Sequence, residues 1–201
     1  PLVEWVSPIP ATLPEPLGPF IPDDLYMQSP NSRYLNQASD VADINAPEAW
    51  EWALGNPNVV IAICGGGINW ITPGYHQSAD VAANLWTNPG EIAGNGIDDD
   101  GNGYVDDIHG WNFYAYTGHP IGDNDIEYTH TPYTLPPDYL LPDPLWWHGT
   151  PMASHAASAI DNCTAVHCGV GVAPQCKIMG VPHYSGESIV YAADNGAKVL
   201  A

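Results

Sequence analysis

The chain has 201 residues, of which 45% are hydrophobic, so it is long and apolar enough to bury the core of one domain. Three Lys and Arg residues stand against 23 Asp and Glu residues, and the formal net charge is −20 at pH 7. Repulsion at this charge argues against nucleic acid and anionic membrane surfaces as partners, and it favours cations. No run of about 18 apolar residues predicts a membrane-spanning helix.

The composition suggests a secreted, extracellular protein. Lys and Arg are scarce, whereas Pro (21), Tyr (11) and Trp (8) are plentiful. The N-terminus carries no basic region followed by an apolar stretch, so we expect no retained signal peptide. Of the four cysteines, Cys163, Cys168 and Cys176 are crowded together, and one local disulfide among them would leave Cys64 and one other free. The spacing does not choose between the possible pairings.

The first half of the chain predicts an irregular arm, a short helix and a buried strand. Residues 1–42 contain many prolines, which rule out a continuous helix and predict a surface arm. Asn45 is the expected N-cap of a helix that runs to about Leu54. The apolar, β-branched run from Val59 to Cys64 predicts a buried parallel strand, which ends at the glycines 65–67.

The second half predicts two irregular stretches followed by an alternation of helices and strands. Residues 84–113 are polar and rich in glycine, residues 114–146 are rich in Pro, Tyr and Asp, and we expect neither stretch in the core. The elements expected after them are a helix from just after His148 to Ile160, a strand over 176–181, a helix over 187–195 closed by Gly196, and a strand that begins at Ala197. This alternation predicts an α/β fold with a doubly wound parallel sheet.

One acidic segment has the spacing of a calcium-binding loop. Oxygen-bearing side chains stand at relative positions 1, 3 and 5, glycine stands at position 6, and a backbone carbonyl is available at position 7. The predicted Ca²⁺ ligands are Asp98, Asp100, Asn102, the carbonyl of Tyr104, Asp106 and Asp107. Position 12 is His109 instead of Glu and no helix pattern flanks the loop, which argues against an EF-hand. The alternative is an acidic turn that is merely solvated.

Several of these segments resemble motifs of the subtilase family of serine peptidases, in the family's order, over residues 40–201. Val59 to Gly67 resembles the strand and turn V-V-x-A-V-I-D-T-G, and His148-Gly149-Thr150 resembles the start of H-G-T-H-V-A-G-T. Gly171 to Met179 resembles G-V-A-P-x-A-K-I-M. The resemblance implies a three-layer subtilisin-like α/β fold with a mostly parallel sheet, incomplete at its C-terminus, in a partial domain over 43–201 with a calcium-loop insertion at 84–113.

The resemblance also places the residues expected to act in catalysis. His148 falls at the position of the triad histidine, whereas Gly65 falls at the position of the triad aspartate. The serine motif G-T-S-M-A-x-P would follow Ala201. Gly149 to Ser154 itself resembles that motif, but Pro151 would then replace the nucleophile. We therefore expect a degenerate, inactive peptidase domain with a calcium-stabilised structural or binding role.

Two other functions are compatible with the sequence. The alternative is the N-terminal piece of an active secreted serine peptidase that residues or a chain beyond Ala201 complete; another is a purely structural extracellular protein. Cys64 as a substitute nucleophile is disfavoured, because alternate strand residues face opposite ways and its sulfur should point into the core. A metal pair of His148 and His155 lacks a third ligand. The expected partners are a polypeptide substrate or ligand, and a second copy or partner chain along the strand edge at 199–201.

Overall fold

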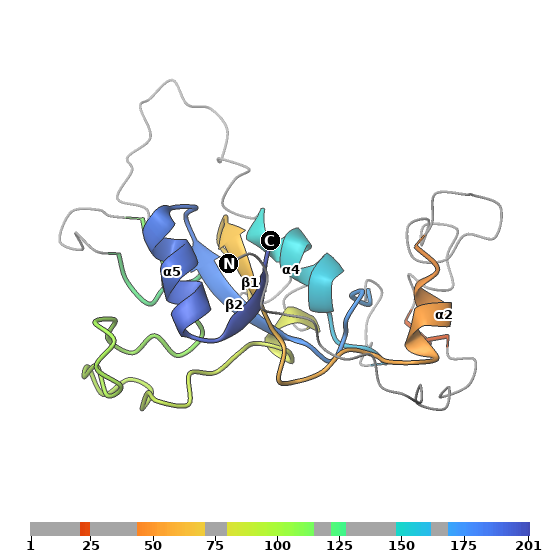
Figure 1. Cartoon of the computed structure of the whole chain (residues 1–201), viewed down its shortest axis with the longest axis horizontal. Coiled ribbons are helices and arrows are strands. Elements are labelled where there is room, and N and C mark those ends of the chain that lie inside the picture. The colour runs from red at the N-terminus through yellow and green to blue at the C-terminus, as the bar shows by residue number, and fades with distance from the viewer. Residues whose placement is uncertain (1–20, 25–43, 71–79, 115–121, 128–147, 162–168) are drawn as a thin grey trace, which may run out of the picture.

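A computed structural model describes the parts of the chain that build the sheet, its helices and the acidic loop (Figure 1). The described residues are 21–24, 44–70, 80–114, 122–127, 148–161 and 169–201. Of the predicted arm over residues 1–42, only 21–24 lie within this part, and Cys163 and Cys168 lie outside it. No helix among the described residues is long and apolar enough to cross a membrane.

Three parallel strands form the centre of the fold. Strand β1 (Val60–Gly65) lies between β2 (Lys177–Pro182) and β3 (Ala197–Leu200). The register of β1 with β2 runs without interruption from the pair Val60 and Lys177 to the pair Gly65 and Pro182. The predicted parallel sheet and mixed α/β fold are thus confirmed. Because the strands are parallel, their carboxyl ends meet at one edge of the sheet.

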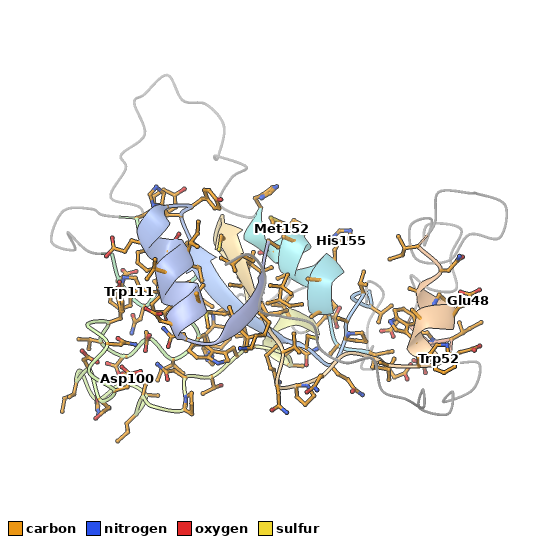
Figure 2. All side chains as sticks on the ribbon, viewed as in Figure 1. Glu48, Trp52, Asp100, Trp111, Met152 and His155 are labelled. Atoms are coloured by element: carbon orange, nitrogen blue, oxygen red, sulfur yellow. The ribbon has the colours of Figure 1, made fainter. Side chains whose placement is uncertain are left out.

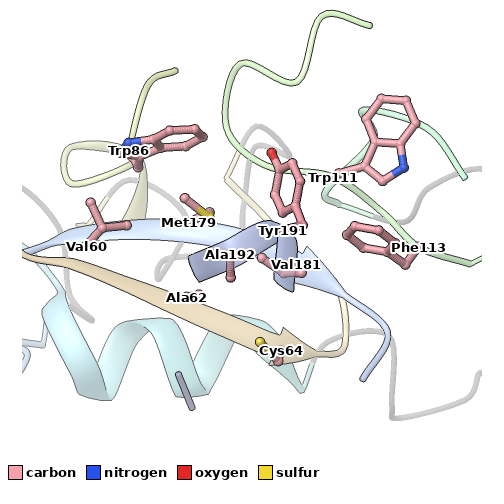
Figure 3. Close-up of a cluster of buried hydrophobic side chains, with 10 residues drawn as sticks. All are labelled: Val60, Ala62, Cys64, Trp86, Trp111, Phe113, Met179, Val181, Tyr191 and Ala192. Atoms are coloured by element: carbon pink, nitrogen blue, oxygen red, sulfur yellow. The ribbon is translucent and has the colours of Figure 1, made fainter. Parts of the chain in front are cut away.

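Helices α4 (Gly149–Ala157) and α5 (Gly186–Asp194) cover opposite faces of this sheet (Figures 1 and 3). Ile61 and Ile63 pack with α4, whereas Val60, Ala62 and Cys64 pack with α5. Alternate residues of a strand point to opposite faces, so an apolar run without polar interruptions is what a strand covered on both faces requires. The helix bounds lie within a few residues of those expected from the sequence.

Helix α2 (Ala46–Trp50) is shorter than predicted, since it ends at Trp50 instead of Leu54. Asn45 precedes it in the left-handed conformation (φ 48°), and the Asn45 side chain makes no capping hydrogen bond. Tertiary packing stabilises the helix instead. Trp50 is 1% exposed, packs with Ala46 and Val170, and donates its indole N–H to the carbonyl of Val172 (2.9 Å).

The expectation that residues 84–113 lie outside the core was wrong. Leu85, Trp86, Trp111 and Phe113 are all buried, and the segment runs beside β2 through backbone bridges. Trp86 donates its backbone N–H to Ile178 (2.7 Å), and Trp111 donates to Gly180 (3.1 Å). Because most residues of the segment are polar, its composition does not indicate that these few apolar residues are buried. Ile126, in the second stretch expected to be irregular, is also buried at 2% exposure.

Glycine makes the close approach to β2 possible. A Cβ at Gly110 (φ +126°) would lie 1.8 Å from the carbonyl oxygen of Gly180. Only a residue without a side chain fits against the strand here. The contact brings the acidic loop that precedes Gly110 against the sheet and α5.

Candidate metal centre and the expected catalytic positions

Three carboxylates of the acidic loop meet at one point. Glu91, Asp100 and Asp107 each offer an oxygen, and these oxygens lie within 4.8 Å of one another. Two oxygens that bind one Ca²⁺ at about 2.4 Å can be at most about 4.8 Å apart, so the spacing permits a shared cation of this size. Figure 2 shows Asp100 in this loop, well away from His155 on α4. The group can therefore hold a cation at a distance from His155.

Asp107 is the buried member of this group. It is 0% exposed, and among the described residues its donors are the neutral groups of Asn88 (2.7 Å), Asn102 (3.0 Å) and Tyr191 (2.7 Å). Burial raises the pKa of the Asp107 carboxyl above its ordinary value, and these hydrogen bonds act against the rise. A carboxylate buried beside other carboxylates favours a cation as its partner.

Tyr191 connects this group to α5. Its hydroxyl donates to Asp107, and its ring packs edge-on against Tyr104 (4.9 Å) and Phe113 (5.4 Å). Figure 3 shows Tyr191 beside Trp111 and Phe113 above the sheet. Burial, followed by the charge of Asp107, raises the pKa of the Tyr191 hydroxyl far above its ordinary value. The hydroxyl therefore stays protonated and acts as a donor.

Sequence reasoning missed Glu91, although Glu91 organises the loop. Its carboxylate accepts the backbone N–H groups of Asp99 (2.8 Å), Asp100 (3.1 Å) and Asp106 (2.9 Å). The predicted ligand set contained no carboxylate before Asp98, because it was based on the spacing that starts at Asp98. A carboxylate directly after the turn Asn88-Pro89-Gly90 was the available signal.

Two predicted ligands hold the loop together and do not join the group of three. The Asp98 carboxylate accepts the backbone N–H groups of Gly101 (2.7 Å), Asn102 (3.1 Å) and Gly103 (2.8 Å). The Asp106 carboxylate accepts backbone N–H groups from the opposite side of the loop. Each of the two carboxylates thus satisfies backbone donors of the loop.

The remaining predicted ligands divide as follows. Asp100 and Asp107 belong to the group, and Asn102 donates its side-chain amide to both of them. The Tyr104 ring packs against Trp111 (5.1 Å), and the Tyr104 hydroxyl donates to Glu187 (3.3 Å). The Tyr104 carbonyl stays a predicted ligand.

A second group of carboxylates joins segments that are far apart in the sequence. Asp23, Asp24 and Asp161 offer oxygens within 4.8 Å of one another. The backbone N–H of Asp161 donates to Asp24 (2.9 Å), and the backbone N–H of Asp23 donates to Asp161 (2.9 Å). Asp24 is 0% exposed, burial raises its pKa, and its Oδ1 has no hydrogen-bond partner in the described part of the structure. The sequence analysis did not identify this group.

The fold brings the expected positions of the triad acid and histidine to the same edge of the sheet. A Cβ at Gly149, the first residue of α4, would lie 2.3 Å from the carbonyl oxygen of Gly66. Thr150 accepts the backbone N–H of Asn69 (2.8 Å) with its hydroxyl. His148 precedes α4, is exposed, and makes no side-chain capping bond to the helix. The end of β1 and the start of α4 are thus in direct contact.

Gly65 itself leaves room for a side chain. A Cβ built there would meet no atom within 4 Å. The Gly65 carbonyl accepts the backbone N–H of His183 (2.7 Å), which ties β1 to the end of β2. An aspartate side chain at position 65 would therefore meet no neighbouring atom, but it would have to adopt a backbone conformation (φ +159°) that favours glycine.

The alternative sites do not form among the described residues. Cys64 and Cys176 are buried free thiols, and Cys64 packs in the cluster on the α5 face, away from α4. Burial raises the pKa of the Cys64 thiol, which disfavours the reactive thiolate. The Nδ1 atom of His155 lies 2.6 Å from the carbonyl oxygen of Pro151. Neither His148 nor His155 belongs to a group of three metal-binding side chains among the described residues.

No known family model matches the sequence, and no curated protein is similar to it. The likeness to the subtilase family rests on the sequence motifs around β1, α4 and β2. What the described residues provide is an edge where β1, α4 and β2 meet, and two carboxylate groups that can hold cations.

Proposed function

We propose that this chain is part of a subtilisin-like serine endopeptidase domain that has lost its catalytic acid and serves a calcium-stabilised structural or binding role. The contact between the end of β1 and the start of α4 carries the proposal, since it places Gly65 and His148 at one edge of the sheet. The motif order along the sequence supports it. The scarcity of Lys and Arg supports an extracellular location.

The glycine at position 65 is the reason to expect inactivity. In a Ser-His-Asp triad the carboxylate orients the imidazole and stabilises its protonated form. In subtilisin, loss of this acid lowers kcat by about 3 × 10⁴. By the same resemblance His148 stands at the position of the triad histidine, from which an imidazole would act as a general base.

Restoring the acid tests the placement of His148. In Gly65→Asp the new carboxylate should lie beside the His148 imidazole and pair with it, because both positions lie at one edge of the sheet. Nuclear magnetic resonance detects the pairing as a change in the chemical shifts of the ring protons. Gly186→Asp is the control, because Gly186 begins α5 on the other face of the sheet and a Cβ there also meets nothing within 4 Å. Unchanged His148 ring resonances in Gly65→Asp would contradict the proposal.

The second candidate is an active peptidase completed by further residues or by a second chain. The exposed edge of β3 favours a partner, because Val199 and Leu200 are 46% and 41% exposed on a short parallel strand. Labelling of the intact protein with a fluorophosphonate distinguishes the two candidates. We expect no labelling, and covalent labelling of a serine would establish the active peptidase.

The calcium part of the proposal rests on Glu91, Asp100 and Asp107. When bound, calcium would neutralise the buried charge of Asp107 and join the loop to α5 through Tyr191. Calcium at 100 times its Kd should stabilise the fold by about 2.7 kcal/mol, and a thermal unfolding curve measures the gain.

A matched pair of loop variants localises this effect. Asp107→Asn should lose most of the calcium-dependent rise in Tm. Asp99→Asn should keep it, because Asp99 is an exposed carboxylate of the same loop outside the group of three. Retention of the full rise in Asp107→Asn would assign calcium to another site, of which the Asp23, Asp24 and Asp161 group is the first to examine.

A further inference from the structure

The chain contains three Asn-Gly dipeptides, at 95–96, 102–103 and 195–196. In such a pair the glycine nitrogen can attack the side-chain carbonyl carbon of asparagine, because glycine has no Cβ to hinder ring closure. The new N–C bond closes a succinimide ring, and the side-chain nitrogen leaves as ammonia. Water then opens the ring to aspartate or isoaspartate. The reaction consumes only water and adds one negative charge to the chain.

We propose that Asn95-Gly96 is a site of spontaneous deamidation, and that the Asp106 carboxylate restrains the reaction. Both residues of the dipeptide are exposed, and the neighbouring Ile97 is 58% exposed. Gly94 and Gly96 both have φ +72°, and a Cβ at either would meet no atom within 4 Å. Residues 92–97 are all exposed, so this segment can open without exposing any of the core, and the cost of opening is that of the hydrogen bonds that hold it.

Asp106 restrains the attacking nitrogen directly. Its Oδ2 accepts the N–H of Gly96 (2.9 Å), and its Oδ1 accepts the N–H of Asn95 (3.2 Å). Asp106 is 8% exposed, so the carboxylate has a defined place in the loop. The side-chain amide of Asn95 is held in turn by Asp99 (2.8 Å). Attack requires the Gly96 nitrogen to leave the carboxylate and turn towards the Asn95 side chain, so the rate depends on how often these bonds open.

Asn102-Gly103 is held by Asp98, Asp100 and the buried Asp107. The Asn102 amide donates to Asp100 (3.1 Å) and to Asp107 (3.0 Å), and Asp107 is 0% exposed. The Gly103 N–H donates to Asp98 (2.8 Å). Opening this dipeptide would break hydrogen bonds to three carboxylates, one of them the fully buried Asp107, whereas opening Asn95-Gly96 breaks bonds to two, those of Asp106 and Asp99.

Asn195-Gly196 is held between α5 and β3. The Asn195 amide donates to the carbonyl of Tyr191 (3.1 Å), and the Gly196 N–H donates to the carbonyl of Ala193 (3.0 Å). The Tyr191 side chain is 3% exposed, so the helix end is anchored in the core. Opening here would unpack α5 from the sheet.

The unmodified chain tests the ranking of the three sites. The full chain is kept in mildly alkaline buffer, and peptide mass spectrometry with enzymatic methylation of isoaspartate measures modification at each asparagine over time. Asn95 should react about tenfold faster than Asn102, the factor expected from about one additional hydrogen bond to a charged group at Asn102-Gly103. Asn95 should also react faster than Asn195, because opening at Asn195 would unpack the end of α5. Equal rates, or faster reaction at either other site, would overturn the proposal. The same ranking is expected with calcium and with chelator, so the outcome is independent of the calcium proposal.

Variants test the role of Asp106. Asp106→Asn keeps an acceptor and tolerates the left-handed backbone (φ 55°) but loses the charge, and it should speed reaction at Asn95 about tenfold. Reaction at Asn195 should not change. Slower reaction at Asn95 would make Asp106 a base for the attack, and faster reaction at Asn195 would show general unfolding; either result refutes the local restraint. Glu48→Gln on α2 controls for the change in charge, and Asn95→Gln should remove the Asn95 signal.

Discussion

The hydrogen bond between Tyr191 and Asp107 gives the most direct test of how the acidic loop is joined to the sheet. Tyr191→Phe removes the hydroxyl and keeps the ring that packs against Tyr104 and Phe113. Asp107 then keeps its amide donors but loses a 2.7 Å bond in a fully buried position. A hydrogen bond to a buried charged group contributes about 1.5 to 3 kcal/mol, so the free energy of unfolding should fall by about 2 kcal/mol.

Tyr104→Phe provides the matched control, because Tyr104 belongs to the same aromatic cluster. Its hydroxyl donates to the exposed Glu187 at 3.3 Å, and loss of such a bond should cost less than about 0.5 kcal/mol. Urea unfolding followed by circular dichroism, in the presence of a chelator, measures both variants against the unmodified chain. Equal losses in the two variants would refute the conclusion that Asp107 depends on Tyr191.

Three further predictions concern the core and the helix ends. Since burial raises the Cys64 pKa, stability should fall as pH rises through the ordinary thiol pKa towards the raised folded value, and Cys64→Ala should reduce this slope in urea titrations at a series of pH values. Ser185→Ala removes the capping box of α5 and should lower the free energy of unfolding by about 1 kcal/mol in the same assay, whereas Ser185→Asn should restore most of it. Gly110→Ala would place a Cβ 1.8 Å from Gly180 and should lower Tm severely, whereas Gly94→Ala, with nothing within 4 Å, should cost only about 1 to 2 kcal/mol for its left-handed backbone.

The strands were predictable because their signal is local. The run that ends at Cys64 places apolar side chains on both faces of its strand, so both faces must be covered from water. In the structure α4 and α5 cover the two faces of β1. Gly196 ends α5 with a positive φ (86°), as its place in the sequence indicates. Helix α2 was predicted too long, because its end depends on how Trp50 packs against Val170 and donates to Val172.

The acidic loop was predictable only in part. The spacing from Asp98 onward indicated Asp100 and Asp107, but it also indicated Asp98 and Asp106, whose carboxylates cap the backbone of the loop instead. Glu91 joins the group because the loop folds back on itself. The spacing of these aspartates does not show which carboxylates accept backbone N–H groups and which face other carboxylates, since all of them are the same residue type in one short segment.

The sequence by itself determined the alternation of strands and helices, the parallel sheet, and the acidic character of the loop. Only the tertiary structure decided that Trp86 and Trp111 enter the core, that Asp24 meets Asp161, and that Gly65 and the start of α4 share one edge. The physical reason is the separation along the chain over which each kind of interaction acts. Backbone preference and apolar period act between neighbours, whereas these contacts join residues far apart in the chain and depend on close packing and on donors supplied by other elements.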